Sequence, residues 1–481
     1  MSESLKNKTI KGASWSFLDN IANQGISFLV GLVLARLLSP EEYGLIGIIM
    51  IFIAVFNSIV DSGFSNSLIR KNNATDKDYN TAFITNMVVS LTLFIVLYFC
   101  APTIANFFAQ PELINLSRVM GTVVIINAFA IVQRTILVKL IDFKTQTKIS
   151  LISSITSGVI GIGMALKGFG IWALVGQQIS RQLLNTAFLW IYAKWYPKIQ
   201  FSIESFKELF GFGWKLLVSG LINTIWDQSY QIIIGKFYTP QTLGQYTRAN
   251  QFSSIFSSNI TSVVQRVTYP VLSSIQNEKE RLVKGYRRVI KTTMFVAFTC
   301  MLGLAGIAEP MVKVLVGEQW LPCVPLLQII CFNMMLYPIH AINLNILQVQ
   351  GRSDLFLKLE ILKKAIAVIP LILGIFIDIY WMLWGSVITG FIAFFINTYY
   401  TGKFLNYSAI QQIKDIALSF IIAFIMFLIV WAISFINLPA LPILLMQLVI
   451  GFCLIISMSE IFKLPEYLEI KNIVLTVLNK K

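Results

Sequence analysis

Charged residues are scarce in this chain. Of its 481 residues only 13% are charged, whereas 56% are hydrophobic. A soluble protein normally has about a quarter of its residues charged, so the shortage excludes a soluble fold and indicates a protein that resides in lipid. The net charge of +15 is also typical of nucleic-acid binding. The basic residues lie between apolar runs, however, so we expect them to orient the chain in a membrane, with no nucleic-acid partner.

Metal-binding and catalytic patterns are also missing. The five cysteines have no metal-ligand spacing, and the chain contains one histidine, His340. The sequence has no G-x-x-x-x-G-K-[ST] phosphate loop, no G-x-S-x-G and no H-E-x-x-H. We therefore expect no metal, no cofactor and no enzymatic activity.

Long apolar runs fill most of the sequence. A helix needs about 20 apolar residues to cross a bilayer, and it satisfies its backbone polar groups internally. We predict an all-α integral membrane protein with about 14 transmembrane helices. The predicted spans are 13–35, 44–60, 82–101, 119–138, 149–166, 171–192, 213–234, 249–272, 292–308, 326–346, 360–377, 382–400, 416–435 and 441–458.

Lys and Arg residues are distributed unequally between the two sides of these spans. The side that holds both termini carries 28 of them, and the opposite side carries 6. Because cytoplasmic loops are enriched in Lys and Arg, we predict an even number of spans and two cytoplasmic termini. The basic N-terminus leads into a full apolar span with no small-residue cleavage site, so we expect a retained first helix and not a removed signal peptide.

One short loop occurs twice. ARLLSPEEYG at 35–44 matches GKFYTPQTLG at 235–244, and IWALVG at 171–176 matches YWMLWG at 380–385. Each copy contains six spans, so we predict two parallel six-helix lobes related by a pseudo-two-fold axis along the membrane normal. In the repeated loop, Pro should stop the first helix and Gly should permit the turn, a purely structural role.

The repeat divides the chain into three parts. We predict an N-lobe over 1–200, a C-lobe over 201–408, and two additional C-terminal helices with a cytoplasmic tail over 409–481. The last two spans contain almost no polar residues, so we expect them to face lipid on all sides, as an appendage to a twelve-helix core.

Polar residues recur at helical spacing inside several spans, where lipid makes them costly. For single Ser and Asn residues, a hydrogen bond between helices is the favoured interpretation and a role in binding is the alternative. The charged residues instead indicate a water-filled cleft between the lobes, and basic residues outnumber acidic ones there, so the cleft should attract anions. For Arg134, Arg266 and Lys215, snorkelling toward the membrane surface remains an alternative. The charged residues within the spans are Arg134, Arg181, Lys215 and Arg266, with Asp19 and Asp227.

We assign candidate roles within this cleft. Arginine forms bidentate contacts with phosphate, and Arg181, near the middle of its span, is the strongest candidate. Asp19 and Asp227 could take up a proton or cation, or could instead pair with arginines, and His340 is either a titrating group or a neutral hydrogen-bond partner. The substrate-binding candidates are Arg181, Arg134, Arg266, Lys215, Asn23, Asn223, Tyr230 and Asn185.

The chain resembles the polysaccharide-export flippases of the multidrug/oligosaccharidyl-lipid/polysaccharide exporter superfamily, and among them the colanic-acid and teichuronic-acid subgroup. The resemblance extends from the N-terminus to about residue 415. It depends on G-x-x-W at 12–15, ARLLSPEEYGL at 35–45, VDSGFSNSLIRK at 60–71, IVQRTILVKLIDFK at 131–144, SNITSVVQRVTYPVLSSIQ at 258–276, GEQWLPCVPLLQIIC at 317–331 and PIHAINLNILQVQGRSDLFLKLEI at 338–361.

The resemblance implies a multi-pass flippase in the bacterial cytoplasmic (inner) membrane. Such proteins move an undecaprenyl-pyrophosphate-linked oligosaccharide repeat unit to the periplasmic or outer leaflet by alternating access, for capsule, exopolysaccharide or O-antigen assembly. The implied partners are the lipid-linked oligosaccharide, membrane lipid, a coupling ion (H⁺ or Na⁺), and the polymerase and glycosyltransferases of the pathway. A cation-coupled small-molecule exporter of the multidrug type is the alternative. A polymerase or ligase, or a non-transporting scaffold, are weaker possibilities.

Overall fold

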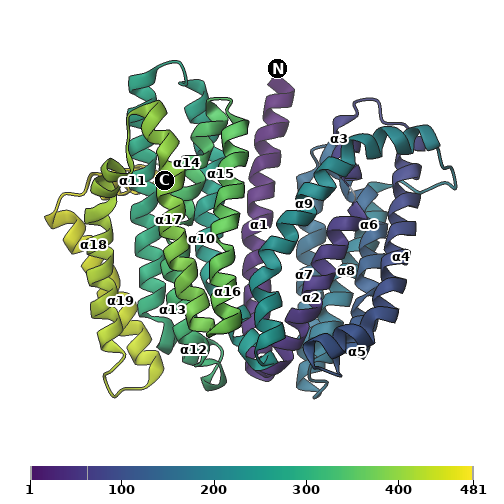
Figure 1. Ribbon diagram of the computed structural model, residues 1–481, viewed down its shortest axis with the longest axis horizontal. Helices are drawn as coiled ribbons and strands as arrows, with labels where there is room; N and C mark the ends of the chain where they lie inside the picture. The colour runs from purple at the N-terminus through teal and green to yellow at the C-terminus, as the bar shows by residue number, and fades with distance from the viewer. Residues whose placement is uncertain (1–2, 62, 479–481) are drawn as a thin grey trace. The chain divides into compact units, whose positions relative to one another are not determined.

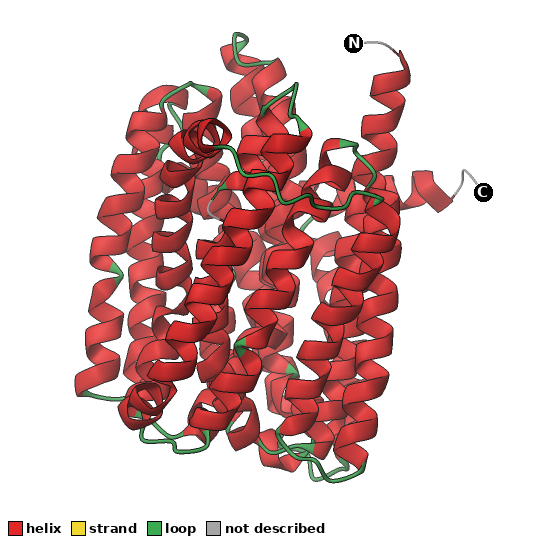
Figure 2. Cartoon of the chain, turned by 90° about the vertical axis from the view of Figure 1, so that its right-hand side faces the viewer, coloured by secondary structure: helices red, strands yellow, loops and turns green. Residues whose placement is uncertain are grey.

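A computed structural model describes residues 3–61 and 63–478, except for the side chains of 3–14, 16–18, 20–21, 266–267, 269–270, 353, 473–474 and 477–478. Every regular element in this part of the chain is helical, as the apolar runs predict (Figures 1 and 2). The contacts between residues divide the chain into a first unit, 1–244, and a second unit, 245–481. Each unit is described by itself.

The first unit contains nine helices within the described residues. They are α1 (Glu3–Leu37), α2 (Pro40–Asp61), α3 (Phe64–Arg70), α4 (Asp76–Phe108), α5 (Leu113–Met120), α6 (Thr122–Lys139), α7 (Phe143–Leu166), α8 (Trp172–Ala193) and α9 (Ile203–Phe237). Polar caps fix several of their N-termini. The carboxylate of Asp142 accepts from the backbone N–H of Thr145 at 3.1 Å, and the hydroxyl of Ser202 accepts from that of Ser205 at 3.2 Å.

The second unit is also helical throughout its described residues. It contains α10 (Pro240–Ser274, whose first residues belong to the first unit), α11 (Lys279–Gly306), α12 (Ala308–Leu315), η1 (Glu318–Trp320), α13 (Cys323–Met334), α14 (Tyr337–Val349), α15 (Ser353–Ile366), α16 (Val368–Phe376), α17 (Ile379–Leu405), α18 (Ala409–Ile433), α19 (Ala440–Ile461) and α20 (Pro465–Leu478). Figure 2 shows the C-terminal helix, α20, lying across the long helices and not along them.

Each of the 14 predicted spans coincides with helix in the structure. Within the described residues, ten helical segments are long and apolar enough to cross a membrane. The four predicted spans that fall short are those of α1, α8, α10 and the α15–α16 pair. Two of these, α8 and α10, contain polar residues noted in the sequence, so the polarity that marks a candidate site also lowers the hydropathy of the helix that carries it. In α1, only the apolar segment Ala22–Leu37 lies in a stretch whose side chains are all described.

The two copies of the repeated loop contact each other reciprocally. A Cβ atom added at Gly44 would lie 1.8 Å from the carbonyl oxygen of Pro240, and one added at Gly244 would lie 1.8 Å from that of Pro40. Both glycines lie inside helices, so the expectation that they permit the turn is wrong. They are needed because two helix backbones meet there, and any side chain would force them apart.

The VDSGF segment at 60–64 joins α2 to α3. The carboxylate of Asp61 accepts from the hydroxyl of Ser65 at 2.5 Å and from its backbone N–H at 3.2 Å. Gly63 has φ +73°, and a Cβ there would lie 2.4 Å from the carbonyl oxygen of Gly213 in α9. This close approach helps to explain why α9, which belongs to the second sequence repeat, packs within the first unit.

The prediction that the last two spans face lipid on all sides is wrong for both α18 and α19. Eight residues of α18 are buried, among them Met426 and Val430, and six residues of α19 are buried, among them Gln447 and Gly451. A Cβ added at Gly306 of α11 would lie 3.1 Å from the Cγ1 atom of Val430. Apolar composition alone did not reveal this contact, because a lipid-facing side chain and a helix-facing side chain are equally apolar.

Candidate functional site

The first unit encloses a polar hollow of about 440 Å³ between α1, α6, α7 and α8. Nine of the twelve side chains that line it are polar or charged, in a bundle that is otherwise strongly apolar. Arg134 enters from α6, and Arg181 and Asn185 enter from α8. Because polar groups are costly at membrane depth, a concentration of this kind is typical of a substrate or ion pathway.

Four of the predicted site residues line the polar hollow, and a fifth borders it. Asp19, Arg134, Arg181 and Asn185 line it although they come from three different helices. Asn23 is hydrogen-bonded to Asp19 one turn along α1. The structure therefore brings these five residues together, and their roles in binding or coupling remain predictions.

A hydrogen-bond network holds the carboxylate of Asp19. Its Oδ1 atom accepts from the hydroxyl of Ser150 and from the side-chain amide of Asn23, both at 2.5 Å. The Oδ1 atom of Asn23 in turn accepts from the hydroxyl of Ser154 at 2.9 Å. Donors from two helices thus fix the orientation of the carboxylate.

The two arginines have a different environment. Asp19 is the carboxylate whose charge acts on Arg181, and Asp61 is the one whose charge acts on Arg134. Among the described residues, neither guanidinium forms a hydrogen bond or an ion pair. Their donors therefore face the polar hollow and remain available to an anionic ligand.

Several polar lining residues were not among the candidates from the sequence, and two of them have polar atoms that stay unpaired within the described part of the chain. The hydroxyl of Ser153 and the amide nitrogen of Gln146 are buried, line the polar hollow and have no hydrogen-bond partner among the described residues. With Ser150 they lie on one face of α7. The run SLISSITSG at 150–158 places serines at helical spacing, and this signal could have identified the face.

A chain of side-chain amides fixes α8 beside the polar hollow. The amide nitrogen of Gln182 donates to Asn127 of α6 at 3.0 Å, and that of Asn127 donates to Asn57 of α2, also at 3.0 Å. The interhelical role weighed for single polar residues therefore applies to Asn127. These two hydrogen bonds fix the rotation of α8 about its axis. That rotation in turn places Arg181 in the polar hollow.

The remaining candidates lie outside the polar hollow. Lys215, Asn223, Asp227 and Tyr230 follow α9, where the first three are exposed and Tyr230 is half-buried. The side chain of Arg266, on α10, is outside the described residues. The cleft between the lobes that these residues were predicted to line therefore remains an expectation.

His340 lies in the second unit, at the contact of α14 with α17. Its Nδ1 atom is 3.2 Å from the amide nitrogen of Asn397. Which of the two atoms donates depends on the tautomer of the imidazole. The two alternatives for His340, a titrating group or a neutral hydrogen-bond partner, therefore both stay predictions.

Arg248 is one of the six cations counted on the side opposite the termini, because the predicted span starts at residue 249, but the structure places it inside α10. Its side chain is only 2% exposed, it donates to Gln251 at 2.7 Å, and its guanidinium lies 5.0 Å from the centre of the Trp320 ring. The predicted span at 249–272 begins too late, because α10 already starts at Pro240. Proline is favoured at the first position of a helix, and Pro40 starts α2 in the same way. One of the six outer cations is therefore a buried structural residue.

These features define a multi-pass helical membrane protein with a charged hollow inside one bundle. The profile of the family described as "Polysaccharide biosynthesis protein" matches residues 33–325. The chain belongs to this family, which confirms the resemblance stated from the sequence motifs.

Individual relatives agree with this assignment. The chain is 27% identical to the succinoglycan biosynthesis transport protein ExoT of Rhizobium meliloti, over 69% of this chain and 68% of that one. It is 26% identical to the teichuronic acid biosynthesis protein TuaB of Bacillus subtilis, over 73% of each. It is 23% identical to the lipopolysaccharide biosynthesis protein WzxC of Escherichia coli, over 77% of this chain and 76% of that one.

Solved structures show the same fold. The lipid II flippase MurJ in an inward closed conformation matches with a TM-score of 0.74 at 17% identity, over 94% of this chain and 98% of that one. An inward-facing multidrug resistance transporter of the MATE family matches with a TM-score of 0.58 at 16% identity, over 85% and 95%. At these identities the likeness concerns the fold alone.

Proposed function

We propose that this protein is a flippase in the bacterial inner membrane. It moves an undecaprenyl-pyrophosphate-linked oligosaccharide from the cytoplasmic leaflet to the periplasmic or outer leaflet, for capsule, exopolysaccharide or O-antigen assembly. Two six-helix lobes with cytoplasmic termini alternate in access, and polymerases and glycosyltransferases of the same pathway consume and supply the substrate. Family membership and the names of the relatives support the substrate class.

The observation that carries this proposal is the pair of arginines in the polar hollow. A pyrophosphate is a compact, multiply charged anion, and a guanidinium binds its oxygens through two parallel hydrogen bonds. Arg134 and Arg181 offer such donors in a hollow where Asp19 is the one acidic side chain among the described lining residues. The side-chain amides of Gln178, Gln182 and Asn185 line the same space and suit the hydroxyl groups of a sugar.

Asp19 gives the site a means of coupling. The carboxylate attracts Arg181, so the substrate and Asp19 compete for the same guanidinium. A proton or a sodium ion on Asp19 weakens its hold on Arg181 and strengthens binding of the anion. Release of the ion on the other side then favours release of the head group.

The test is leaflet-resolved detection of a labelled lipid-linked oligosaccharide in proteoliposomes. Arg181→Ala should lower the translocation rate roughly 10- to 100-fold, the value of a charge-assisted hydrogen-bonded contact. Arg281→Ala is the matched control, because Arg281 is 69% exposed and, within the described part of the chain, forms an ion pair only with Glu278 on the surface. Asp19→Asn should retain translocation but lose its dependence on an imposed proton or sodium gradient.

Two outcomes would contradict the proposal. If Arg181→Ala, inserted and folded, translocates at the rate of the unmodified protein, the polar hollow does not bind the substrate. If the unmodified protein instead extrudes cationic dyes along an ion gradient and leaves the lipid-linked oligosaccharide in place, the chain is a small-molecule exporter.

A further inference from the structure

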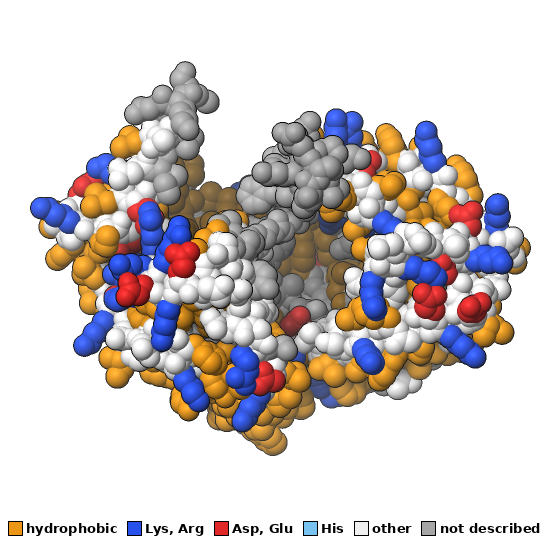
Figure 3. Space-filling view, turned by 90° about the horizontal axis from the view of Figure 1, so that it is seen from above, with side chains coloured by type: hydrophobic (Ala, Val, Ile, Leu, Met, Phe, Trp, Pro, Cys, Tyr) orange, Lys and Arg blue, Asp and Glu red, His pale blue; other side chains and the backbone are white. Residues whose placement is uncertain are grey.

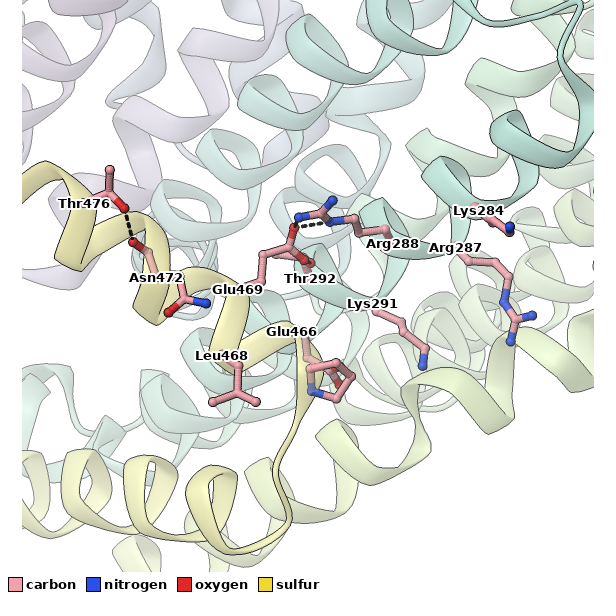
Figure 4. Close-up of a pocket in the computed structure, with 11 residues that line it drawn as sticks. Lys284, Arg287, Arg288, Lys291, Thr292, Glu466, Leu468, Glu469, Asn472 and Thr476 are labelled. Carbon is pink, nitrogen blue, oxygen red and sulfur yellow. Dashed lines mark hydrogen bonds and ion pairs between the residues drawn. The ribbon is translucent and has the colours of Figure 1, made fainter.

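A second, larger recess lies in the second unit, between α11 and α20. We call it the basic groove, and it has a volume of about 920 Å³ (Figure 4). Four cations of α11 line one wall, at intervals that place them on one helix face: Lys284, Arg287, Arg288 and Lys291. Helix α20 forms the opposite wall through residues such as Leu468 and Glu469.

The position of α20 is the one expected for a helix at the surface of a bilayer. α20 starts only three residues after α19, which is long and apolar enough to span the membrane. It then runs across the bundle (Figure 2), as helices at a membrane surface do. Apolar side chains nearby are exposed, with Ile461 at 73%, Phe462 at 52% and Leu475 at 45%. These side chains offer contacts to acyl chains beside the cations.

The acidic residues that line the basic groove each accept a hydrogen bond from the protein, although the Oε2 atom of Glu466 is buried without a partner among the described residues. Glu466 is buried and accepts from Ser419 at 2.6 Å, and Glu469 pairs with Arg288 and accepts from Thr292. Asp415 of α18 makes two bonds to Arg287, at 2.8 and 2.9 Å. These pairs fix α18 and α20 against α11, and they leave the carboxylates on the protein side of the recess.

Two lysines are left with donors to spare. Lys284 forms no ion pair among the described residues, and Lys291 lies 3.5 Å from Asp415, a carboxylate that Arg287 already binds at a shorter distance. The two ammonium groups come from positions two helical turns apart on α11. Figure 4 shows both lysines on the α11 side of the recess, with Arg288 reaching toward α20.

We propose that the basic groove binds the phosphate head group of an anionic phospholipid of the cytoplasmic leaflet. Lys284 and Lys291 contact the phosphate, Arg288 borders it, and the exposed apolar side chains near α20 take the acyl chains. A free phosphate would gain nothing from that apolar rim, whereas a membrane lipid brings its own chains to it. The end of each unit seen in Figure 3 carries many Lys and Arg side chains. Their positive charge attracts the negatively charged cytoplasmic leaflet.

The experiment measures lipid binding to the full chain in zwitterionic detergent, with no transport substrate present. Phosphatidylglycerol and phosphatidylcholine are titrated separately, and bound lipid is counted by native mass spectrometry. The variant K284Q/K291Q should bind phosphatidylglycerol about 30-fold more weakly, because each lysine near an anionic surface contributes about a factor of five. K198Q/K207Q is the matched control, because it removes the same charge as K284Q/K291Q. Both of its lysines are exposed and lie in the first unit.

Several results would overturn the proposal. Equal binding of both lipids by the unmodified protein, or equal losses in the two double variants, would show that the basic groove is no specific site. If sodium glycerol phosphate binds as tightly as phosphatidylglycerol, the site takes free phosphate. If undecaprenyl phosphate displaces phosphatidylglycerol selectively, the site belongs to the transport substrate. Because no translocation is measured, failure here leaves the proposed flippase activity untouched, and the reverse also holds.

Discussion

At the scale of single residues, the glycines of the repeated loop are the most constrained positions. Gly44 and Gly244 each meet a backbone carbonyl oxygen of the other loop at a distance that no Cβ tolerates. A flexible side chain could move aside, but a backbone carbonyl inside a helix cannot move without disturbing its neighbours. We therefore expect these positions to accept no other residue.

Gly44→Ala tests this constraint. The added methyl group must push α2 away from Pro240, and overpacking of this kind costs about 1–3 kcal/mol or more. Thermal unfolding of the purified protein should show a lower midpoint. Gly163→Ala is the control, because nothing lies within 4 Å of the added Cβ and alanine favours a helix over glycine by about 1 kcal/mol. Equal midpoints for Gly44→Ala and Gly163→Ala would disprove the close contact.

At the scale of helices, the positions of elements followed from the sequence better than their contacts did. Apolar length located a helix at every predicted span, because lipid allows no other regular structure for such runs. The short helices α3, α5, α12 and α20 were missed, since each is too short for the criterion of a span. The rotation of a helix depends on single polar contacts such as that of Gln182 with Asn127. A single sequence does not show which polar residue of one helix bonds to which residue of another.

A buried amide connects four helices of the second unit. The Oδ1 atom of Asn343 in α14 accepts from Tyr286 of α11 at 2.8 Å, from Thr401 of α17 at 2.9 Å and from Gln412 of α18 at 3.0 Å. Asn343 is fully buried, so water cannot replace any of these bonds. One side chain therefore fixes the mutual register of α11, α14, α17 and α18.

Asn343→Leu should loosen this bundle. The substitution keeps the branched shape and the number of heavy atoms but leaves three donors without an acceptor, and we expect a loss of roughly 2–4 kcal/mol in the free energy of unfolding. Thermal unfolding and resistance to proteolysis should both decrease. Thr92→Val is the control, because Thr92 is exposed and bonds only to a carbonyl of its own helix. A variant Asn343→Leu as stable as the control would mean that packing alone holds these helices.

At the scale of the whole molecule, the internal repeat and the packed units are different divisions of the chain. The sequence repeat starts anew near residue 200, whereas α9 packs with the first unit and the boundary between units follows residue 244. The close approach of Gly63 to Gly213 and the tilted ring contacts of Phe64 with Phe206 and Phe210 attach α9 to the α2–α3 segment. The sequence could reveal the duplication, but it could not reveal this attachment, because packing brings together residues about 150 positions apart.

The C-terminal segment from residue 409 contains α18, α19 and α20. Two truncated chains test which of these helices the rest of the molecule needs. A chain that ends after residue 408 loses α18, so Arg287 loses Asp415, Asn343 loses Gln412, and the apolar face of α11 that covers Met426 and Val430 is exposed. We expect this chain to aggregate or be degraded. A chain that ends after residue 464 loses only α20, so it should remain folded with a midpoint a few degrees lower, yet lose preferential binding of phosphatidylglycerol. Size-exclusion chromatography of detergent extracts and thermal unfolding distinguish the two chains. A monodisperse, fully stable chain ending at residue 408 would restore the view that α18 is an appendage in lipid.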